Sequence, residues 1–205
     1  MINENDKFNS LPGSKNASIT EKKSSMKESF SDGGKTFCKS RKIRRVIGID
    51  PGLANTGFGI VDFKNGIYRM VCYGCVTTKK EQPLTERLLA IYTRLQAVID
   101  EFKPTESSME ELFFVKNVTS GISVAEAKGV ATLCLAQNAI ELKEYKPNQI
   151  KQAVTGSVKA DKDLVERYVQ LLLNLKEKPN PDHAADALAC AITHLHYTAG
   201  LTGHL

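Results

Sequence analysis

The 205-residue sequence lacks an apolar run long enough to span a bilayer, and its N-terminus lacks the apolar core of a secretory signal peptide. No second Cys-x-x-Cys pair accompanies Cys72 and Cys75, so these residues cannot complete a typical zinc site. We interpret the five cysteines as reduced packing residues, because most lie in apolar segments: Cys38, Cys72, Cys75, Cys134 and Cys190. These absences argue against a membrane protein or a disulfide scaffold and predict a soluble, cytoplasmic protein.

The sequence is also too short for two domains of ordinary size. With 41% hydrophobic and 25% charged residues, it can bury one good core but hardly two. Residues 1–45 are poor in large apolar side chains and rich in Ser, Lys, Asn and Gly, so burial there cannot offset the entropy of ordering. We therefore predict a disordered basic tail over residues 1–45 and one folded domain over residues 46–205.

Positive charge is concentrated in that tail. The tail holds 11 of the 28 Lys and Arg residues and 5 of the 23 Asp and Glu residues, which leaves residues 46–205 close to neutral. Any nucleic-acid surface on the domain must therefore be local. The basic run over residues 39–45 is either a solvated linker or a phosphate contact. Acidic residues in the tail argue against an organelle transit peptide, and a wrongly chosen start codon upstream of Met26 explains the tail equally well.

The domain begins with an apolar strand that ends in a carboxylate. Residues 46–49 are Val-Ile-Gly-Ile, Asp50 follows, and a Pro-Gly turn leads into a second strand made slim by Gly57 and Gly59. An isolated buried carboxylate is unfavourable unless it is paired, hydrogen-bonded or bound to a metal ion. Asp50 is therefore either a simple turn residue or a group that requires partners from elsewhere in the chain.

Periodicity and turn signals predict the other elements. Asn65-Gly66 is typical of a hairpin turn before a third strand over residues 68–76, and apolar residues at helical spacing indicate a helix over residues 84–102. A short fourth strand from residue 107, a loop over residues 117–121 and a helix rich in small residues over 122–138 follow.

The C-terminal part is expected to contain a strand over residues 140–145 and a short helix from Pro147. A helix over residues 161–175 comes next, and an Ala-rich buried helix has Asp182 as its N-cap. We expect the 161–175 helix to carry its apolar residues on one side: Leu164, Val165, Tyr168, Leu171, Leu172 and Leu175.

Acidic residues from three distant places can meet at one end of such a sheet. Glu110 and Glu111 point to opposite faces of the fourth strand, so only one of them can join Asp50. His183 and Asp186 are three residues apart and share one face at the start of the last helix. Carboxylate and imidazole ligands suit magnesium or manganese, and two such ions can activate water for phosphodiester hydrolysis. The alternative is that Asp186 only favours the helix dipole and His183 lies on the surface.

One local concentration of basic residues lies within the domain. Five lysines fall between residues 143 and 162, including Lys151 and Lys162. Such a run is usually a solvated face, and phosphate contact is the alternative.

Four motifs, taken together, resemble those of one nuclease family. They are Ile47-Gly48-Ile49-Asp50-Pro51-Gly52 with Thr56-Gly57, Glu110-Glu111-Leu112-Phe113 with Lys116-Asn117, Lys151-Gln152, and His183-Ala184-Ala185-Asp186-Ala187-Leu188-Ala189. Over about residues 46–196 the sequence is similar to the RuvC crossover-junction endodeoxyribonucleases, the bacterial Holliday junction resolvases. The resemblance implies an α/β, ribonuclease-H-like fold with a mixed five-stranded sheet flanked by helices. It also implies a bacterial enzyme of DNA recombination and repair that acts as a homodimer on four-way junction DNA, with RuvA and RuvB as branch-migration partners.

The resemblance assigns the metal site by position. Asp50, Glu110 and Asp186 match catalytic metal ligands. His183 matches a position that either ligates a metal or prepares the attacking water, so it joins the expected catalytic and metal-binding set. The implied cofactor is Mg²⁺ or Mn²⁺, with two ions in each active site.

The resemblance also assigns DNA and subunit contacts. Phe113 matches an aromatic residue that stacks on bases at the opened junction. Lys116, Lys151 and Lys162 are the expected basic DNA contacts, and the helix from Ile122 corresponds to the dimer interface.

Two departures and three alternatives stay open at this stage. The tail has no counterpart in the family pattern, and Ser107-Ser108 replaces apolar strand residues, so Glu111 rather than Glu110 could face Asp50. An actin-like or sugar-kinase ATPase would need a second glycine-rich phosphate loop and a second domain, which the sequence lacks. A YqgF-type nuclease acting on RNA or other branched DNA is a closer alternative. A junction-binding protein without catalysis is the third.

Overall fold

A mixed five-stranded sheet forms the centre of the computed structural model, which describes residues 42–111 and 118–199. Its strands are β1 (Arg44–Asp50), β2 (Asn55–Lys64), β3 (Ile67–Thr77), β4 (Glu106–Glu110) and β5 (Leu142–Tyr145), in the order β3-β2-β1-β4-β5. The first three strands are antiparallel neighbours, and β4 and β5 run parallel to β1. The predicted α/β architecture with a mixed five-stranded sheet is confirmed. Most of the predicted tail, Cys38 included, lies outside the described residues.

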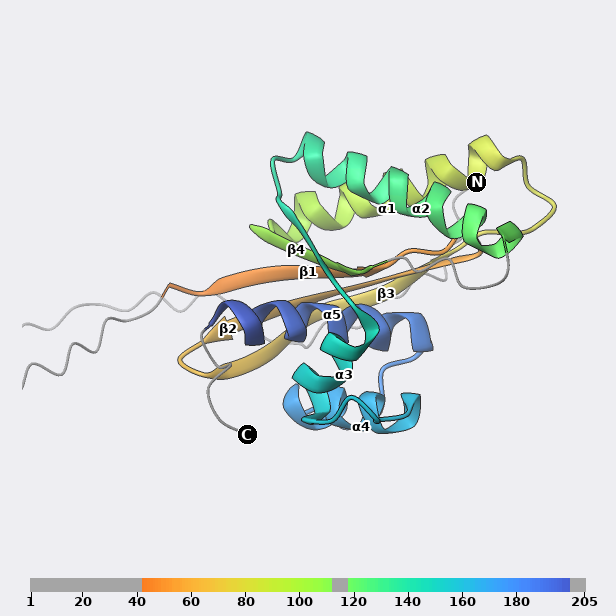
Figure 1. The fold of residues 1–205 in the computed structure, drawn as a ribbon. Helices are drawn as coiled ribbons and strands as arrows, with labels where there is room; N and C mark the ends of the chain where they lie inside the picture. Colours follow the sequence, from red (N-terminus) through yellow and green to blue (C-terminus); the bar gives the residue numbers. More distant parts are fainter. Residues whose placement is uncertain (1–41, 112–117, 200–205) are drawn as a thin grey trace, which may run out of the picture.

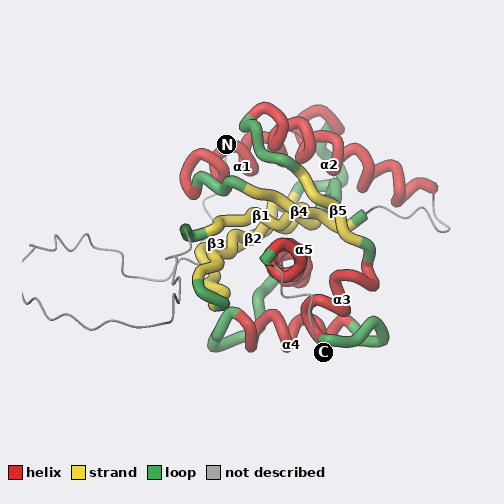
Figure 2. Tube along the Cα trace, turned by 60° about the vertical axis from the view of Figure 1, so that its left-hand side comes forward, coloured by secondary structure: helices red, strands yellow, loops and turns green. Residues whose placement is uncertain are grey.

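Helices cover both faces of the sheet (Figures 1 and 2). The helices α1 (Leu84–Phe102) and α2 (Val118–Gln137) lie on one face, and α5 (Asp182–Thr198) lies against the other. The helices α3 (Pro147–Thr155) and α4 (Lys162–Leu172) pack on α5 on the side away from the sheet. Among the described residues, no helix combines the length and apolar character needed to cross a membrane.

Strand alternation divides the buried side chains into two cores. In β1, Ile47 and Ile49 pack with residues of α1 and α2, whereas Val46 packs on the α5 side. Asp50 is an even-numbered residue like Val46 and therefore points to the α5 side as well. The alternation alone thus selects the face on which a site around Asp50 is built.

Glycines allow α5 to lie directly on β1 and β2. A methyl group built on Gly48 would lie 1.9 Å from the Ala187 carbonyl oxygen, and one on Gly57 would lie 1.9 Å from the carbonyl oxygen of His183. Gly57 is the strand partner of Asp50. Because Gly48 and Gly57 have no side chains, the start of α5 can lie beside the end of β1.

Several local predictions are confirmed. Asn65 and Gly66 form the turn between β2 and β3, and both have the positive φ angles (54° and 83°) that such a two-residue turn requires. The bounds of α1 match the predicted 84–102, and α3 begins at Pro147. The last helix is buried along most of its length, as its apolar composition predicts.

Predictions at the start of the domain and of α2 need correction. The first strand begins at Arg44, within the basic run, and Arg44 and Arg45 form ion pairs with Glu106 and Asp62. Two of the cations considered for phosphate contact are therefore neutralised within the fold. The loop predicted over 117–121 is wrong for residues 118–121, because α2 begins at Val118.

Two predictions about the C-terminal helices are also wrong. The N-cap residue of α5 is Pro181, and Asp182 is the first helical residue. The helix α4 ends at Leu172, before the predicted end at residue 175. Its apolar residues lie on one side, as predicted, in two adjacent stripes. Val165 and Val169 are buried, whereas Leu171 is 70% exposed and belongs to an outward stripe with Leu164 and Tyr168. The buried stripe belongs to the core around α5, whereas the other stripe faces outward.

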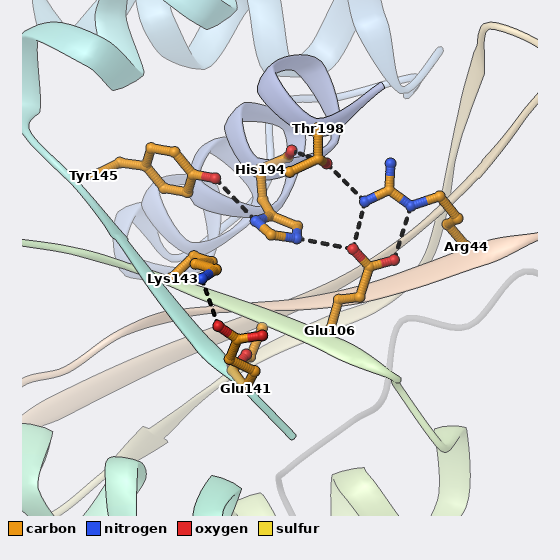
Figure 3. A network of polar contacts seen from close by, with 8 residues as sticks. Arg44, Glu106, Glu141, Lys143, Tyr145, His194 and Thr198 are labelled. Carbon is orange, nitrogen blue, oxygen red and sulfur yellow. Dashed lines mark hydrogen bonds and ion pairs between the residues drawn. The ribbon is translucent and has the colours of Figure 1, made fainter. Parts of the chain in front are cut away.

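A polar network joins β1, β4, β5 and α5 (Figure 3). Glu106 accepts hydrogen bonds from Arg44 Nε (2.8 Å) and from His194 Nε2 (2.9 Å). The buried His194 ring also places Nδ1 2.9 Å from the Tyr145 hydroxyl. Because a carboxylate only accepts, Nε2 carries the hydrogen and Nδ1 accepts from Tyr145. The network attaches β4, whose Ser-Ser pair offers little apolar packing, to its neighbours.

Acidification is expected to weaken this network. Burial lowers the pKa of His194 below its ordinary value of 6.5, although its hydrogen bond to Glu106 opposes the shift. Such a group contributes stability that is full above the unfolded-state pKa and is lost as the pH falls through the folded-state pKa. The stability advantage of wild type over His194→Gln in urea unfolding should therefore shrink between about pH 7.5 and about pH 5. A constant or growing advantage would contradict this account.

Candidate active site

The first pair of site residues is Asp50 and His183. Asp50 ends β1 in a half-buried position, and its Oδ2 lies 2.7 Å from His183 Nδ1 at the start of α5. A carboxylate accepts hydrogen bonds, so Nδ1 donates and Nε2 is left for another partner. This contact depends on Gly57, because the backbone of His183 occupies the space that a side chain there would fill.

Asp186 completes a cluster of three metal-binding groups. Ligand atoms of Asp50, His183 and Asp186 all lie within 4.8 Å of one another. His183 and Asp186 are on one face of α5, as their spacing predicts. Both side chains lie close to the Asp50 carboxylate. This arrangement favours a metal site over the alternative in which Asp186 only interacts with the helix dipole.

Glu110 faces the same space. It ends β4 beside β1, and it lines a cavity of about 160 Å³ together with Asp50, Asp186, Lys151 and Lys162. Glu106 lies four residues earlier and contacts α5, so strand alternation turns Glu110 to that face too. Glu111 does not line this cavity. The structure therefore places Glu110, not Glu111, with Asp50, despite the Ser-Ser pair in β4.

The carboxylates are crowded. Burial raises the pKa of Asp50 and that of Glu110 above their ordinary values, and the negative charge of Asp186 raises both further. For Asp50 the hydrogen bond from His183 opposes the shift, and for Glu110 the charge of Lys151 does so. Removing negative charge or adding a cation would relieve this repulsion. The donor set of carboxylates and one imidazole suits a divalent cation such as magnesium or manganese.

Two of the predicted basic residues lie at the cavity. Lys162 Nζ, at the start of α4, is 3.3 Å from Asp186 Oδ2 and 3.3 Å from Asp182 Oδ2. Burial lowers the pKa of Lys162, but the carboxylates outweigh this effect and the pKa is raised overall. Lys151 lines the cavity from α3. The other expected DNA contacts, Phe113 and Lys116, lie outside the described residues.

Comparison with known proteins identifies the family. Residues 46–194 match the model of the family described as "Crossover junction endodeoxyribonuclease RuvC". The chain is 51% identical to the RuvC protein of Treponema denticola, over 72% of this chain and 83% of that protein. It is 50% identical to the RuvC protein of Chloroflexus aurantiacus, over 76% of this chain and 94% of that protein. This chain belongs to the RuvC family.

Solved structures agree with this assignment. The structure of Thermus thermophilus RuvC in complex with Holliday junction substrate has a TM-score of 0.73 and 35% sequence identity. The match covers 76% of this chain and 94% of that one. The fold is thus the one that the RuvC resemblance implied. Membership of the RuvC family disfavours both the ATPase alternative and the YqgF-type alternative.

Sequence reasoning missed the apolar wall of the cavity. Residues of three helices form it: Pro147, Ile150, Val165, Ala189 and Cys190. Burial raises the pKa of the Cys190 thiol well above its ordinary value, and the nearby carboxylates add to the effect. Cys190 is therefore a neutral packing group, in agreement with the interpretation of the cysteines. The apolar pattern of α5 indicates that Ala189 and Cys190 are buried, but nothing in it indicates that they border the carboxylates.

Proposed function

We propose that this chain resolves Holliday junctions by metal-dependent hydrolysis of phosphodiester bonds at the Asp50 site. One observation carries the proposal. Three residues from β1 and α5 converge within 4.8 Å, and Glu110 faces the same cavity from β4. Related RuvC proteins are named crossover junction endodeoxyribonucleases, and the Thermus thermophilus protein has been seen with Holliday junction substrate.

The proposed residue roles follow from the geometry. Asp50, Glu110, His183 and Asp186 would hold Mg²⁺ or Mn²⁺, with two ions in each site. Such ions lower the pKa of a bound water and stabilise the charge on the leaving oxygen. Since His183 Nδ1 is engaged by Asp50, its Nε2 is the nitrogen available to a cation or to the attacking water.

The lysines have a separate proposed role. Lys151 and Lys162 border the cavity and would contact the phosphates that flank the cut bond. Lys162 is held by Asp182 and Asp186, so its ammonium is already placed over the carboxylates that substrate must approach. Phe113 would stack on bases of the opened junction, and Lys116 would add a further DNA contact.

The assembly is also part of the proposal. Resolution of a four-way junction requires two nicks in strands of like polarity, which two sites in a symmetric homodimer can make. We expect RuvA and RuvB as branch-migration partners and the bacterial cytoplasm as the place of action.

Cleavage of a labelled four-way junction tests the proposal. The full chain should introduce paired symmetric nicks in the presence of Mg²⁺, and EDTA should abolish them. Linear duplex of the same sequence serves as the control substrate. Binding of the junction without any cutting over a series of divalent ions would favour the junction-binding alternative without catalysis. Cutting by Asp50→Asn at the wild-type rate would refute the proposed site.

A further inference from the structure

Among the described residues, the backbone at Glu110 is paired with β5 but not with β1. The Glu111 N–H donates to the Tyr145 carbonyl oxygen (2.8 Å), and the Glu110 backbone also contacts Cys190 of α5. The ladder between β1 and β4 ends at the pair Ile49 and Met109, so Glu110 lies one residue beyond it. Within the described part of the chain, its strand partner is Tyr145 of β5. A side chain that must place its carboxylate beside Asp50 therefore extends from the end of a five-residue strand. A metal ligand must be held to within about 0.5 Å, so every contact that fixes the β4 end bears on the position of the Glu110 carboxylate.

Lys128 provides a contact at this point from the opposite side of the sheet. It lies on α2, and its side chain is only 13% exposed. Its Nζ is 2.8 Å from Glu144 Oε1 of β5 and 3.5 Å from the carbonyl oxygen of Glu110. One ammonium thus connects α2 with the ends of both β4 and β5.

Lys128 and Lys151 lie on different sides of Glu110. Lys151 lines the cavity, where substrate would compete for it. Lys128 lies behind the strand, so its contact with the Glu110 carbonyl oxygen stays in place when the cavity is filled.

We propose that Lys128 is a positioning residue, which holds the end of β4 so that Glu110 presents its carboxylate to a divalent cation. The proposal rests on the function proposed above. Lys128 does not line the cavity and would touch neither cation nor DNA. Its effect passes through the Glu110 backbone and through Glu144, which keeps the ammonium in place.

Manganese binding without DNA tests the proposal. Mn²⁺ would be titrated into full-length protein and the free ion measured by electron paramagnetic resonance. Lys128→Met should weaken Mn²⁺ binding about tenfold and slow single-turnover cleavage of a saturating four-way junction by about ten- to a hundredfold. Junction affinity in EDTA should stay within about twofold of wild type, because the phosphate contacts lie elsewhere. Lys128→Arg should restore most of the loss, since a guanidinium can reach both partners.

Matched variants separate positioning from general stability. Lys103→Met removes a lysine from an exposed ion pair with Asp100 and should leave Mn²⁺ affinity unchanged. If Lys128→Met folds poorly, Glu144→Gln keeps the ammonium but removes the carboxylate that holds it. This variant should also weaken Mn²⁺ binding, by a smaller factor.

Wild-type Mn²⁺ affinity and cleavage rate in both Lys128→Met and Glu144→Gln would overturn the proposal. So would an Arg variant as defective as the Met variant. Failure of the wild-type protein to bind Mn²⁺ or to cut would instead refute the proposed function.

Discussion

Replacing Asp186 with asparagine is expected to reduce junction cleavage by roughly a thousandfold, which corresponds to about 4 kcal/mol of transition-state stabilisation. Asp186 shares the cluster with Asp50 and His183, so the substitution removes one of the charges that would hold the cations. Binding of the junction in EDTA should remain close to wild type, because phosphate contacts are made by other residues. Single-turnover cleavage and gel-shift titration with the same labelled junction measure the two effects.

Asp182→Asn is the matched control. Asp182 lies on the same helix, and its Oδ2 is as far from Lys162 Nζ as that of Asp186 is. It is absent from the group of ligand atoms around Asp50. Its replacement should therefore change cleavage by no more than about threefold. Equal losses in the two variants would mean that the ion pair with Lys162, and not cation binding, explains the effect of Asp186.

Replacing Gly48 with alanine is expected to destabilise the folded protein by about 3 kcal/mol. The added methyl group would lie 1.9 Å from the Ala187 carbonyl oxygen and 2.8 Å from the Ala191 nitrogen. Both obstacles are backbone atoms, so α5 as a whole must move away from β1. His183 and Asp186 move with it, and cleavage should fall even under conditions where the variant is folded. Urea unfolding and single-turnover cleavage measure the two consequences.

Gly129→Ala is the control for Gly48→Ala, because it adds the same methyl group at a position where there is room for it. A methyl group on Gly129 would have no described atom within 4 Å apart from its chain neighbours and the backbone of its own helix, and the residue lies inside α2. This variant should gain up to about 1 kcal/mol of stability, because alanine favours a helix over glycine. A Gly48→Ala protein as stable as wild type would show that α5 can leave β1 freely. The account of how the site is assembled would then be wrong.

Local patterns in the sequence predicted most of the elements and drew attention to Asp50, His183 and Asp186. The Asn65-Gly66 turn, the bounds of α1 and the buried character of α5 depend on residues a few positions apart, so a short window contains them. The same applies to the shared helix face of His183 and Asp186. Asp50 at the end of an apolar strand indicated where partners were needed.

Only the tertiary structure decided which of several local possibilities is realised. Register with β1 and β5 turned Glu110 toward Asp50, and packing on α5 buried Val165 rather than Leu171. Arg44 of β1 pairs with Glu106, sixty-two residues away in the sequence. Lys128 of α2 contacts Glu110 of β4 and Glu144 of β5. The sequence by itself indicated the strands, the helices and the candidate groups Asp50, His183 and Asp186 through local spacing and residue chemistry, and its motifs indicated the fold class through their resemblance to the RuvC family. Register, the choice of buried face and the partners of charged groups depend on segments that meet only when the chain has folded.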